Sequence, residues 1–227
     1  SIIQTYAQHD KAMAGAPETE TAPWFVPFNP APREGTEAIV DRAWFRRTGA
    51  ELVSDSPRGL FNLINCFQDA GITDMVTEYL GERPALSVRK TSLRQVPKDV
   101  NAEHGWHQDG AFLGQGIRTV NVWIALTDCG VDAPSMDMLP RRMTEIVPTG
   151  TEGAAFDWSV SQLAVRDAAG DTPPVRLQFR EGDAIIFDEM NLHRTGGGPG
   201  MTKDRFAIEA WFFAPSCYPL EQLPMMV

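Results

Sequence analysis

The sequence is poor in cysteine and has no closely spaced cysteine pair. Its three cysteines, Cys66, Cys129 and Cys217, are odd in number, far apart and without a C-x-x-C spacing. A disulfide framework and a zinc ribbon both need such pairs, so neither is indicated. We therefore expect a protein of a reducing compartment, the cytoplasm, in which the cysteines are small buried apolar residues.

Positive charge and long apolar runs are also scarce. The chain carries 20 Lys and Arg against 30 Asp and Glu, a formal charge of −10. Nucleic-acid binding needs clustered Lys and Arg side chains, so we expect no nucleic-acid partner. The longest apolar runs, such as 122–126 and 210–214, are far too short to cross a membrane, and we expect no membrane partner.

The N-terminus, Ser1–Gln4, lacks the basic and apolar segments of a secretory signal. It also lacks an initiator Met, so we expect that some residues precede it. The remaining composition, 43% hydrophobic and 22% charged, is ordinary for a soluble globular protein. A chain of 227 residues is long enough for one sizeable core, and we expect a single domain over 1–227.

The first 83 residues are expected to form an arm followed by helices. Five prolines interrupt regular structure within 1–35. Apolar residues then recur at helical spacing, which predicts a helix over 36–48 and a second from Pro57 to near Gly71. A third is predicted from a cap at Thr73 to a stop at Gly81.

After Pro84 the alternation of apolar and polar residues replaces the helical period. Strands are predicted over Ala85–Val96, Arg118–Asp128, 136–139, 144–147, 175–179, 183–187 and 205–213. Helices followed by many short strands are typical of a mainly β protein with flanking helices, here a jelly-roll or cupin-like barrel beside an N-terminal helical layer. We expect the barrel to occupy 84–215 and a C-terminal tail to occupy 216–227.

The stretch Trp106-His107-Gln108-Asp109 places an imidazole and a carboxylate two residues apart. At that spacing both side chains leave the same face of an extended chain. His193, which follows the strand predicted over 183–187, can supply a third ligand. Together His107, Asp109 and His193 form a candidate 2-His-1-carboxylate triad for Fe(II), which leaves positions open for a cosubstrate and O₂.

An H-x-D tripeptide alone is a weak signal, because a His and an Asp at this spacing often lie in surface turns. The inference of a metal site therefore depends on the whole set of features, which occur in this order along the chain: the tripeptide, a long strand with a polar face, a second His and a late Arg. The two other histidines, His9 and His104, have no partner at ligand spacing. We interpret His9 as solvated and His104 as structural.

Arg205 lies twelve residues after His193, at the start of a predicted strand. A guanidinium group binds a carboxylate through two charge-assisted hydrogen bonds, which Lys cannot reproduce. We therefore expect Arg205 to anchor a dicarboxylate cosubstrate.

Further residues could line the same pocket. Trp123 and Asn121 alternate with apolar residues on the strand predicted over Arg118–Asp128. For a Trp on a strand, packing in the core is an equally good interpretation. Lys90 and Arg89 are also candidates, and only one of them should face inward because neighbouring residues of a strand point to opposite sides.

The motifs of this chain, in their order, resemble those of the phytanoyl-CoA dioxygenase family of Fe(II)/2-oxoglutarate oxygenases. The resemblance rests on residues 106–109, the strand with Trp123, the Glu181-Gly182-Asp183 turn before His193, and the late Arg205. It covers roughly Pro84 to Pro215, and the N-terminal helices match only in kind.

This resemblance implies a double-stranded β-helix in which His107, Asp109 and His193 hold iron. It also implies that 2-oxoglutarate is bound by Arg205 and by Thr195, the hydroxyl residue two positions after the second histidine. Thr195 has a simpler alternative, since a Thr before Gly196-Gly197-Gly198 can instead bond to backbone.

One segment departs from the family. Members usually carry Pro-Gly-Ser-His after the strand with Trp123, whereas this chain has Asp137-Met138-Leu139-Pro140-Arg141-Arg142. The departure weakens any inference of the substrate from the family, but it does not involve the predicted iron ligands. The substrate-side candidates, each of which could equally serve core or loop packing, are Trp106, Gln108, Phe112, Met136, Asp137 and Met138.

The function expected from these features is an Fe(II)- and 2-oxoglutarate-dependent oxygenase. It would use O₂ to hydroxylate a small molecule and release succinate and CO₂. Desaturation, ring formation and epimerisation stay open, as do the substrate and the oligomeric state. The alternatives are a cupin-type metal-dependent isomerase or hydrolase without 2-oxoglutarate, and a non-catalytic binding barrel.

Overall fold

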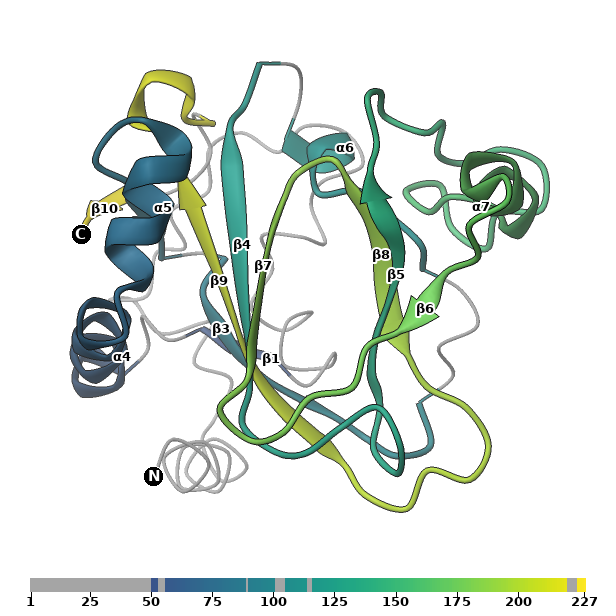
Figure 1. Ribbon diagram of the computed structural model, residues 1–227, viewed down its shortest axis with the longest axis horizontal. Coiled ribbons are helices and arrows are strands. Elements are labelled where there is room, and N and C mark those ends of the chain that lie inside the picture. The colour runs from purple at the N-terminus through teal and green to yellow at the C-terminus, as the bar shows by residue number, and fades with distance from the viewer. Residues whose placement is uncertain (1–49, 53–55, 89, 101–104, 114–115, 220–223) are drawn as a thin grey trace, which may run out of the picture.

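The computed structural model describes residues 50–52, 56–88, 90–100, 105–113, 116–219 and 224–227 (Figure 1). The helix predicted over 36–48 and the N-terminal arm lie outside these residues. No helix in the described ranges has both the length and the apolar character that crossing a membrane requires.

Local sequence explains where the first two described helices begin and end. Helix α4 (Pro57–Asp69) starts with Pro57 after Ser56, whose Oγ accepts a hydrogen bond from the N–H of Gly59 at 3.2 Å. Helix α5 (Ile72–Leu80) ends at Gly81, whose φ of 73° is the left-handed conformation that glycine adopts readily. The predicted cap at Thr73 is wrong, because Gly71 with a φ of 71° occupies the N-cap and provides no side-chain bond.

The larger sheet has seven strands arranged around β9 (Arg205–Phe213), and every strand pair in it is antiparallel. Strand β4 (Thr119–Ala125) pairs along one edge of β9, and β3 (Ser92–Val96) and β2 (Ala85–Ser87) share the other. The outer strands are β7 (Ala184–Asp188) beside β4, β1 (Ala50–Leu52) beside β3, and β10 (Pro224–Met226) beside β2. The expected C-terminal tail therefore contributes a strand.

The smaller sheet faces the larger one and has the order β6-β5-β8 (Figure 1). Its strands are β6 (Val175–Arg176), β5 (Ser135–Arg142) and β8 (Asn191–Gly196). The pairing of β5 with β8 shifts register between Met138 and Arg142. Pro140 lies within this interval, and the shift fits its lack of an N–H for the ladder.

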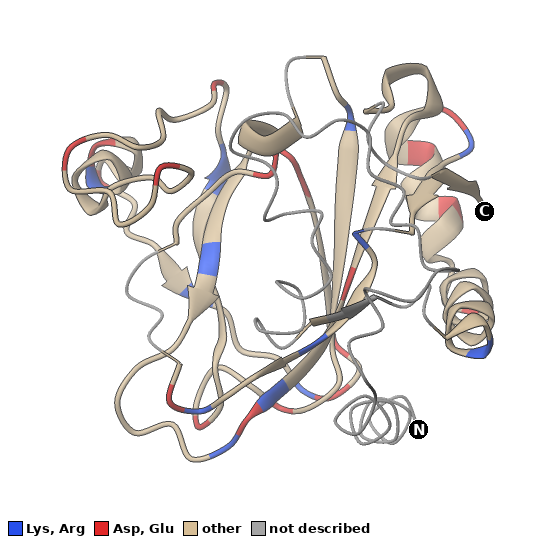
Figure 2. Cartoon of the chain, turned by 180° about the vertical axis from the view of Figure 1, so that it is seen from behind, with Lys and Arg blue, Asp and Glu red and all other residues tan. Residues whose placement is uncertain are grey.

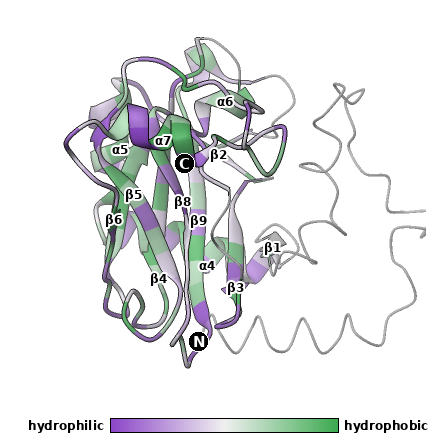
Figure 3. Cartoon of the chain, turned by 90° about the vertical axis from the view of Figure 1, so that its right-hand side faces the viewer, coloured by the Kyte–Doolittle hydropathy of each residue, from purple (hydrophilic) through white to green (hydrophobic). Residues whose placement is uncertain are grey.

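The two faces of the larger sheet pack against different partners, as the alternation along β4 and β9 predicts. The outer face, including Val120, Val122 and Phe212, is covered by α4 and α5 through residues such as Phe67 and Val76. The inner face meets the smaller sheet in a cluster of Trp123, Ala125, Ala207, Met136, Met138 and Phe187. In Figure 3 the hydropathy accordingly changes from residue to residue along the strands.

Three predicted strands differ from the structure. The run Ala85–Val96 is split into β2 and β3 by a turn in which the Thr91 hydroxyl and the Lys90 N–H both donate to the carbonyl of Ser87. The run 175–179 pairs over β6 only, apart from an isolated bridge between Phe179 and Cys129. No strand forms over 144–147.

Six elements of the described residues were not predicted. Three are strands, β1, β8 and β10, of which β8 carries His193. The others are helices α6 (Gly110–Leu113) and α7 (Gln162–Ala169), and the 3-10 turn η3 (Pro215–Cys217). Basic and acidic positions are interspersed over the strands and loops seen in Figure 2. The fold is thus a mainly antiparallel β structure of two facing sheets with helices outside, as the sequence pattern predicts.

Candidate metal centre

His107 and His193 are brought together by backbone pairing along β8, an outer strand of the smaller sheet. His193 lies on β8, and His107 forms an isolated antiparallel bridge with it. The N–H of each residue donates to the carbonyl of the other, at 2.9 and 3.0 Å. Asp109 follows in the turn that leads into α6, whose first N–H, from Gly110, donates to the carbonyl of Glu189 at 2.9 Å.

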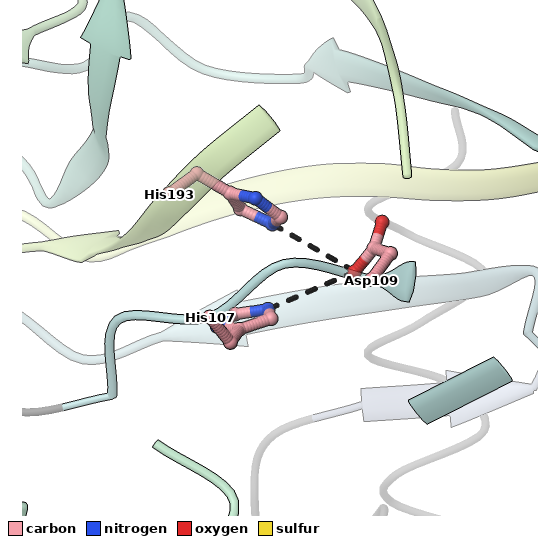
Figure 4. A group of neighbouring side chains, drawn as sticks. All are labelled: His107, Asp109 and His193. Atoms are coloured by element: carbon pink, nitrogen blue, oxygen red, sulfur yellow. Dashed lines mark ion pairs between the residues drawn. The ribbon is translucent and has the colours of Figure 1, made fainter. Parts of the chain in front are cut away.

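The three side chains converge on one point (Figure 4). His107 Nε2 lies 3.8 Å from Asp109 Oδ1, and His193 Nε2 lies 3.9 Å from the same oxygen. One ligand atom from each residue lies within 4.8 Å of the others, a spacing that one metal ion can bridge. The His193 and Asp109 side chains are 5% and 2% exposed, whereas His107 is 22% exposed, so solvent reaches the group from the side of His107.

Hydrogen bonds orient all three candidate ligands. The Nδ1 atoms of His107 and His193 lie 2.7 and 3.0 Å from the carbonyl oxygens of Gly105 and Asn191. A carbonyl only accepts, so each Nδ1 carries the proton and each Nε2 offers its lone pair toward Asp109. Asn121 Nδ2 donates to the second carboxylate oxygen, Asp109 Oδ2, at 3.3 Å.

Burial favours the neutral form of the His107 imidazole. It lowers the pKa of His107 well below the ordinary value, and the nearby His193 lowers it further. Burial also raises the pKa of Asp109, against the opposing effect of His193. A neutral imidazole is the form that binds a metal, and a metal ion would supply the charge that stabilises a buried carboxylate.

Gln108, a predicted substrate residue, instead bonds to backbone groups next to the triad. Its buried carboxamide donates to the carbonyls of Glu145 and Met190 at 3.1 and 2.9 Å and accepts from the N–H of Val147 at 2.7 Å. The bonds to Glu145 and Val147 satisfy backbone groups of the segment 144–147, which was predicted to be a strand. The two donated bonds use both N–H groups of the amide and leave neither free for a ligand.

Trp106 and Asp137 also lie away from the triad. Trp106 is buried on the outer side of the smaller sheet, in a cluster with Leu139, Val160 and Leu192 under α7. Asp137 lies on the opposite face of β5 from Met136 and Met138, which pack in the cluster between the sheets. Its carboxylate binds Arg176 and Arg194. The structure therefore does not bring these two predicted substrate residues to the site.

Arg205, the predicted cosubstrate anchor, faces the space between the sheets. Its guanidinium is buried, lies 5.2 Å from the centre of the Trp123 ring, and donates from Nη1 to the carbonyl of Ser135 at 3.2 Å. Its Nε and the Oδ1 atom of Asn121 are buried without a hydrogen-bond partner. A buried polar atom without a partner is costly, and such atoms mark a place where a polar ligand fits.

Two further charged residues share this interior, and the sequence interpretation gave Arg94 no role. Arg94 on β3 contacts Glu209 on β9 at 3.2 Å, and its buried Nε has no partner. Burial and the nearby Arg94 lower the pKa of Arg205 to about 10. Burial alone would raise the pKa of Glu209, but Arg94 and Arg205 outweigh it and the net pKa is lowered. The alternation along 92–96 is the signal that could have identified Arg94.

Lys90 lies near the same group. Its ammonium is 4.7 Å from the centre of the Trp211 ring, and burial lowers its pKa to about 8 against the attraction of Asp109 and Glu209. Arg89, the other candidate at this turn, lies outside the described residues. Thr195 pairs with Met136 across β5 and β8, two residues along β8 from His193 and therefore on the same face.

The aromatic residues beside His107 complete the site. Phe112, a predicted substrate residue on α6, has its ring centre 5.5 Å from that of His107. Trp158 lies edge-on to His107 at 5.9 Å and stacks on Phe156. Neither Phe156 nor Trp158 was predicted as a site residue, because the loop that carries them has no period and only the tertiary fold brings it to the candidate ligand His107.

The model of one protein family matches most of the chain. It is described as phytanoyl-CoA dioxygenase (PhyH), and it matches residues 31–201. The matched range includes His107, Asp109 and His193 and stops four residues before Arg205. No match was found among curated protein sequences.

Several solved structures share the fold at low sequence identity. EctD from S. alaskensis with bound Fe is 15% identical with a TM-score of 0.57, covering 75% of this chain and 57% of that one. The epimerase SnoN, in complex with Fe³⁺, alpha ketoglutarate and nogalamycin RO, is 15% identical with a TM-score of 0.55, covering 78% and 75%. EvdO2 from Micromonospora carbonacea var. aurantiaca is 16% identical with a TM-score of 0.54, covering 75% and 66%. The chain thus spans less than two thirds of EctD and of EvdO2, and at these identities the likeness establishes the fold.

Proposed function

The chain belongs to the phytanoyl-CoA dioxygenase family, and on that premise we propose that it is an Fe(II)- and 2-oxoglutarate-dependent oxygenase that hydroxylates a small molecule. The observation that carries the proposal is the convergence of His107, Asp109 and His193 at ligand spacing. Two imidazoles and one carboxylate are the donor set of non-haem Fe(II) oxygenases. EctD with bound Fe and SnoN with Fe³⁺ and alpha ketoglutarate share the fold.

The donor atoms present fit such a metal. Both histidines turn Nε2 toward Asp109 because their Nδ1 atoms are engaged by backbone carbonyls. Asn121 holds Asp109 Oδ2, so that Oδ1 faces the two histidines. Fixing the orientation of each ligand in this way increases metal affinity.

The interior cations fit a dicarboxylate cosubstrate. Arg205 would bind one carboxylate, since its buried Nε has no protein partner and the planar guanidinium matches a carboxylate. Trp123 and Asn121 would form the wall beside it, and Lys90 and Thr195 would add a cation and a hydroxyl. A dianion would also relieve the repulsion between Arg205 and Arg94 that contributes to the lowered pKa of Arg205.

When bound, Fe(II) and 2-oxoglutarate would supply the activation of O₂, with one oxygen atom leaving in succinate, beside CO₂, and the other entering a substrate C–H bond. The residues of the chain position these reactants and exclude water. Met136 and Met138 line the interior beside His193, and Phe112 contacts His107 on the exposed side. We propose these three as substrate-side residues.

An anaerobic titration tests the proposal. Adding Fe(II) and then 2-oxoglutarate should produce the weak visible charge-transfer absorbance of the iron–cosubstrate chelate, and admitting O₂ should release succinate. His107→Ala and His193→Ala should lose both signals while staying folded, and His9→Ala serves as the matched control. A protein that binds metal but gives no chelate absorbance would favour a cupin-type isomerase or hydrolase, and one that binds neither would favour a binding barrel.

Epimerisation is the second candidate reaction, because SnoN, an epimerase, shares the fold. The two reactions differ in the fate of O₂. Under ¹⁸O₂ a hydroxylase transfers label to its product, whereas an epimerised product has the mass of the substrate. Mass spectrometry of the product therefore separates them.

A further inference from the structure

Three aromatic rings gather beside the one candidate ligand that solvent reaches. The Phe112 and Trp158 rings lie 5.5 and 5.9 Å from the His107 ring and 6.0 Å from each other. Phe156 stacks on Trp158 at 5.1 Å with an interplanar angle of 1°. Phe156 is 50% exposed and Trp158 is 39% exposed, although aromatic side chains gain free energy from burial.

The loop that carries Phe156 and Trp158 is fixed to the metal-ligand segment. The Ser159 hydroxyl donates to the carbonyl of Phe156 at 3.0 Å and accepts from its N–H at 3.1 Å. The next residue, Val160, pairs with Trp106 directly before His107, and its N–H donates to the Trp106 carbonyl at 2.8 Å. The exposed rings are therefore held by the same backbone that presents the ligand.

Space at Gly105 also fits this arrangement. The φ of Gly105 is 102°, in the region that favours glycine, and its carbonyl accepts the Nδ1 hydrogen bond of His107. A Cβ atom there would lie 3.5 Å from the Trp158 ring. The indole thus packs over this glycine, close to the ligand backbone.

Resting on the proposed function, we propose that Phe112, Phe156 and Trp158 form a substrate platform, and that the substrate carries a flat, uncharged ring which stacks on it. The platform is continuous with the exposed side of the candidate metal centre, where a substrate must approach. The cation–π contacts in the described part of the chain fall on Trp106, Trp123 and Trp211, so the charged interior and this apolar platform are separate. Phe156 and Trp158 are parallel, whereas Phe112 is tilted by 53° to Trp158. A flat ring packs against the face of the Phe156–Trp158 stack better than a puckered ring or a linear chain of similar size.

Two probes with the same carbon skeleton test the proposal: 2-naphthol, which is flat, and decahydro-2-naphthol, which is puckered. Their dissociation constants are measured by calorimetry on protein loaded anaerobically with Fe(II) and 2-oxoglutarate, so that no turnover occurs. We expect 2-naphthol to bind more tightly. We expect Phe156→Ala and Trp158→Leu each to weaken its binding about threefold to tenfold, the effect of losing one aromatic contact.

Matched variants separate stacking from simple apolarity. Trp158→Leu keeps an apolar side chain without the flat ring, and Trp158→Phe should restore most of the affinity for 2-naphthol. Phe61→Ala removes an aromatic on α4 that is 63% exposed, and it should change neither affinity. Equal binding of the two probes to the wild type, or 2-naphthol affinity unchanged in both Phe156→Ala and Trp158→Leu, would overturn the platform.

The chelate absorbance keeps the two hypotheses apart. If it forms in the wild type and in both variants while probe discrimination is absent, the platform is wrong and the oxygenase proposal stands. If it does not form in the wild type, the oxygenase proposal is wrong. The probe series on the metal-free protein then still decides whether the rings select flat ligands.

Discussion

The molecule contains two clusters of arginine and carboxylate side chains on opposite sides of the smaller sheet, and they differ in how completely their hydrogen bonds are used. On the outer side, Asp137 accepts from Arg176 Nε at 2.8 Å and Nη2 at 3.2 Å, and from Arg194 Nε at 3.1 Å. Arg176 Nη2 also donates to the carbonyl of Gly197 at 2.8 Å. Between the sheets, Arg94 and Arg205 each keep a buried Nε without a partner.

From this difference we infer that the outer cluster stabilises the fold, and we propose that the interior cluster binds a ligand. The Asp137 cluster links β5, β6 and β8 and leaves none of its buried side-chain atoms unbonded among the described residues. The interior group has three cations, Lys90, Arg94 and Arg205, near two carboxylates, Glu209 and Asp109. Excess buried charge destabilises a fold unless a ligand compensates it. We therefore expect changes in the first cluster to lower stability and changes in the second to lower function.

The largest effect is expected when one carboxylate of each cluster is replaced: Asp109 in the interior group and Asp137 in the outer cluster. Asp109→Ala should weaken iron binding at least about a hundredfold and abolish succinate formation, because it removes a ligand and not only its support. Asp137→Asn should keep the activity per folded molecule and lower the free energy of unfolding by about 2 to 3 kcal/mol, since it breaks a buried ion pair whose arginines are partly exposed. Metal content, succinate assays and melting curves measure both. Wild-type iron stoichiometry in Asp109→Ala would mean that the triad assignment is wrong.

The next effect concerns the two arginines. Arg205→Lys should raise the KM for 2-oxoglutarate about tenfold to a hundredfold, because the charge stays while the two parallel hydrogen bonds are lost. The KM for the substrate should change far less. Arg176→Lys is the matched control, for which we expect a lower Tm and an unchanged KM. If Arg205→Lys, like the control, leaves the KM for 2-oxoglutarate unchanged, Arg205 is structural and Lys90 is the next candidate anchor.

A smaller effect is expected at Gln108, a fully bonded residue between two ligands. Gln108→Leu leaves the carbonyls of Glu145 and Met190 and the N–H of Val147 without their partner. We expect iron affinity to fall about tenfold through misplacement of His107 and Asp109, together with a lower Tm. Gln68→Leu, an exposed position on α4, is the control. If iron affinity is unchanged at temperatures where Gln108→Leu is folded, Gln108 contributes to stability and does not position the candidate ligands.

The smallest effect is a dependence of stability on pH that arises from Lys90. Burial lowers its pKa from 10.5 to about 8, so between these values the unfolded chain holds a proton that the folded chain has lost. The free energy of unfolding should therefore rise with pH across this window, and the penalty of the buried charge is fully present below about pH 8. Lys90→Met should flatten the rise. Denaturant titrations at several pH values between 7 and 10 measure the free energy of unfolding of both proteins. If its dependence on pH is the same in the wild type and in Lys90→Met, the Lys90 ammonium is solvated in the folded state.

Much of the fold could be predicted because its signals are local. The period-2 alternation of Val120 and Val122 with Thr119 and Asn121 reflects the geometry of a strand, and the structure confirms both faces of β4 and β9. The start of helix α4 and the end of α5 were predicted from Pro57 and Gly81. Two local predictions were wrong because tertiary or backbone context differed. Helix α5 begins after Gly71 in a left-handed conformation and not after a cap at Thr73. Over 144–147 the Gln108 side chain, and not a neighbouring strand, bonds the backbone of Glu145 and Val147.

The candidate triad was also predicted from residue types and order, and the structure brings its three members together. The sequence by itself thus determined the donor set, the strand faces and the family resemblance, because each is written in residue identity and short spacing. Tertiary structure decided which polar residues are bonded and which are left over. The strand face placed Asp137 among arginines, and pairing at the edge of the smaller sheet set His107 against His193. A loop without any period brought Trp158 to His107, a candidate metal ligand. Contacts between segments distant in the chain depend on packing, which leaves no periodic trace in the sequence.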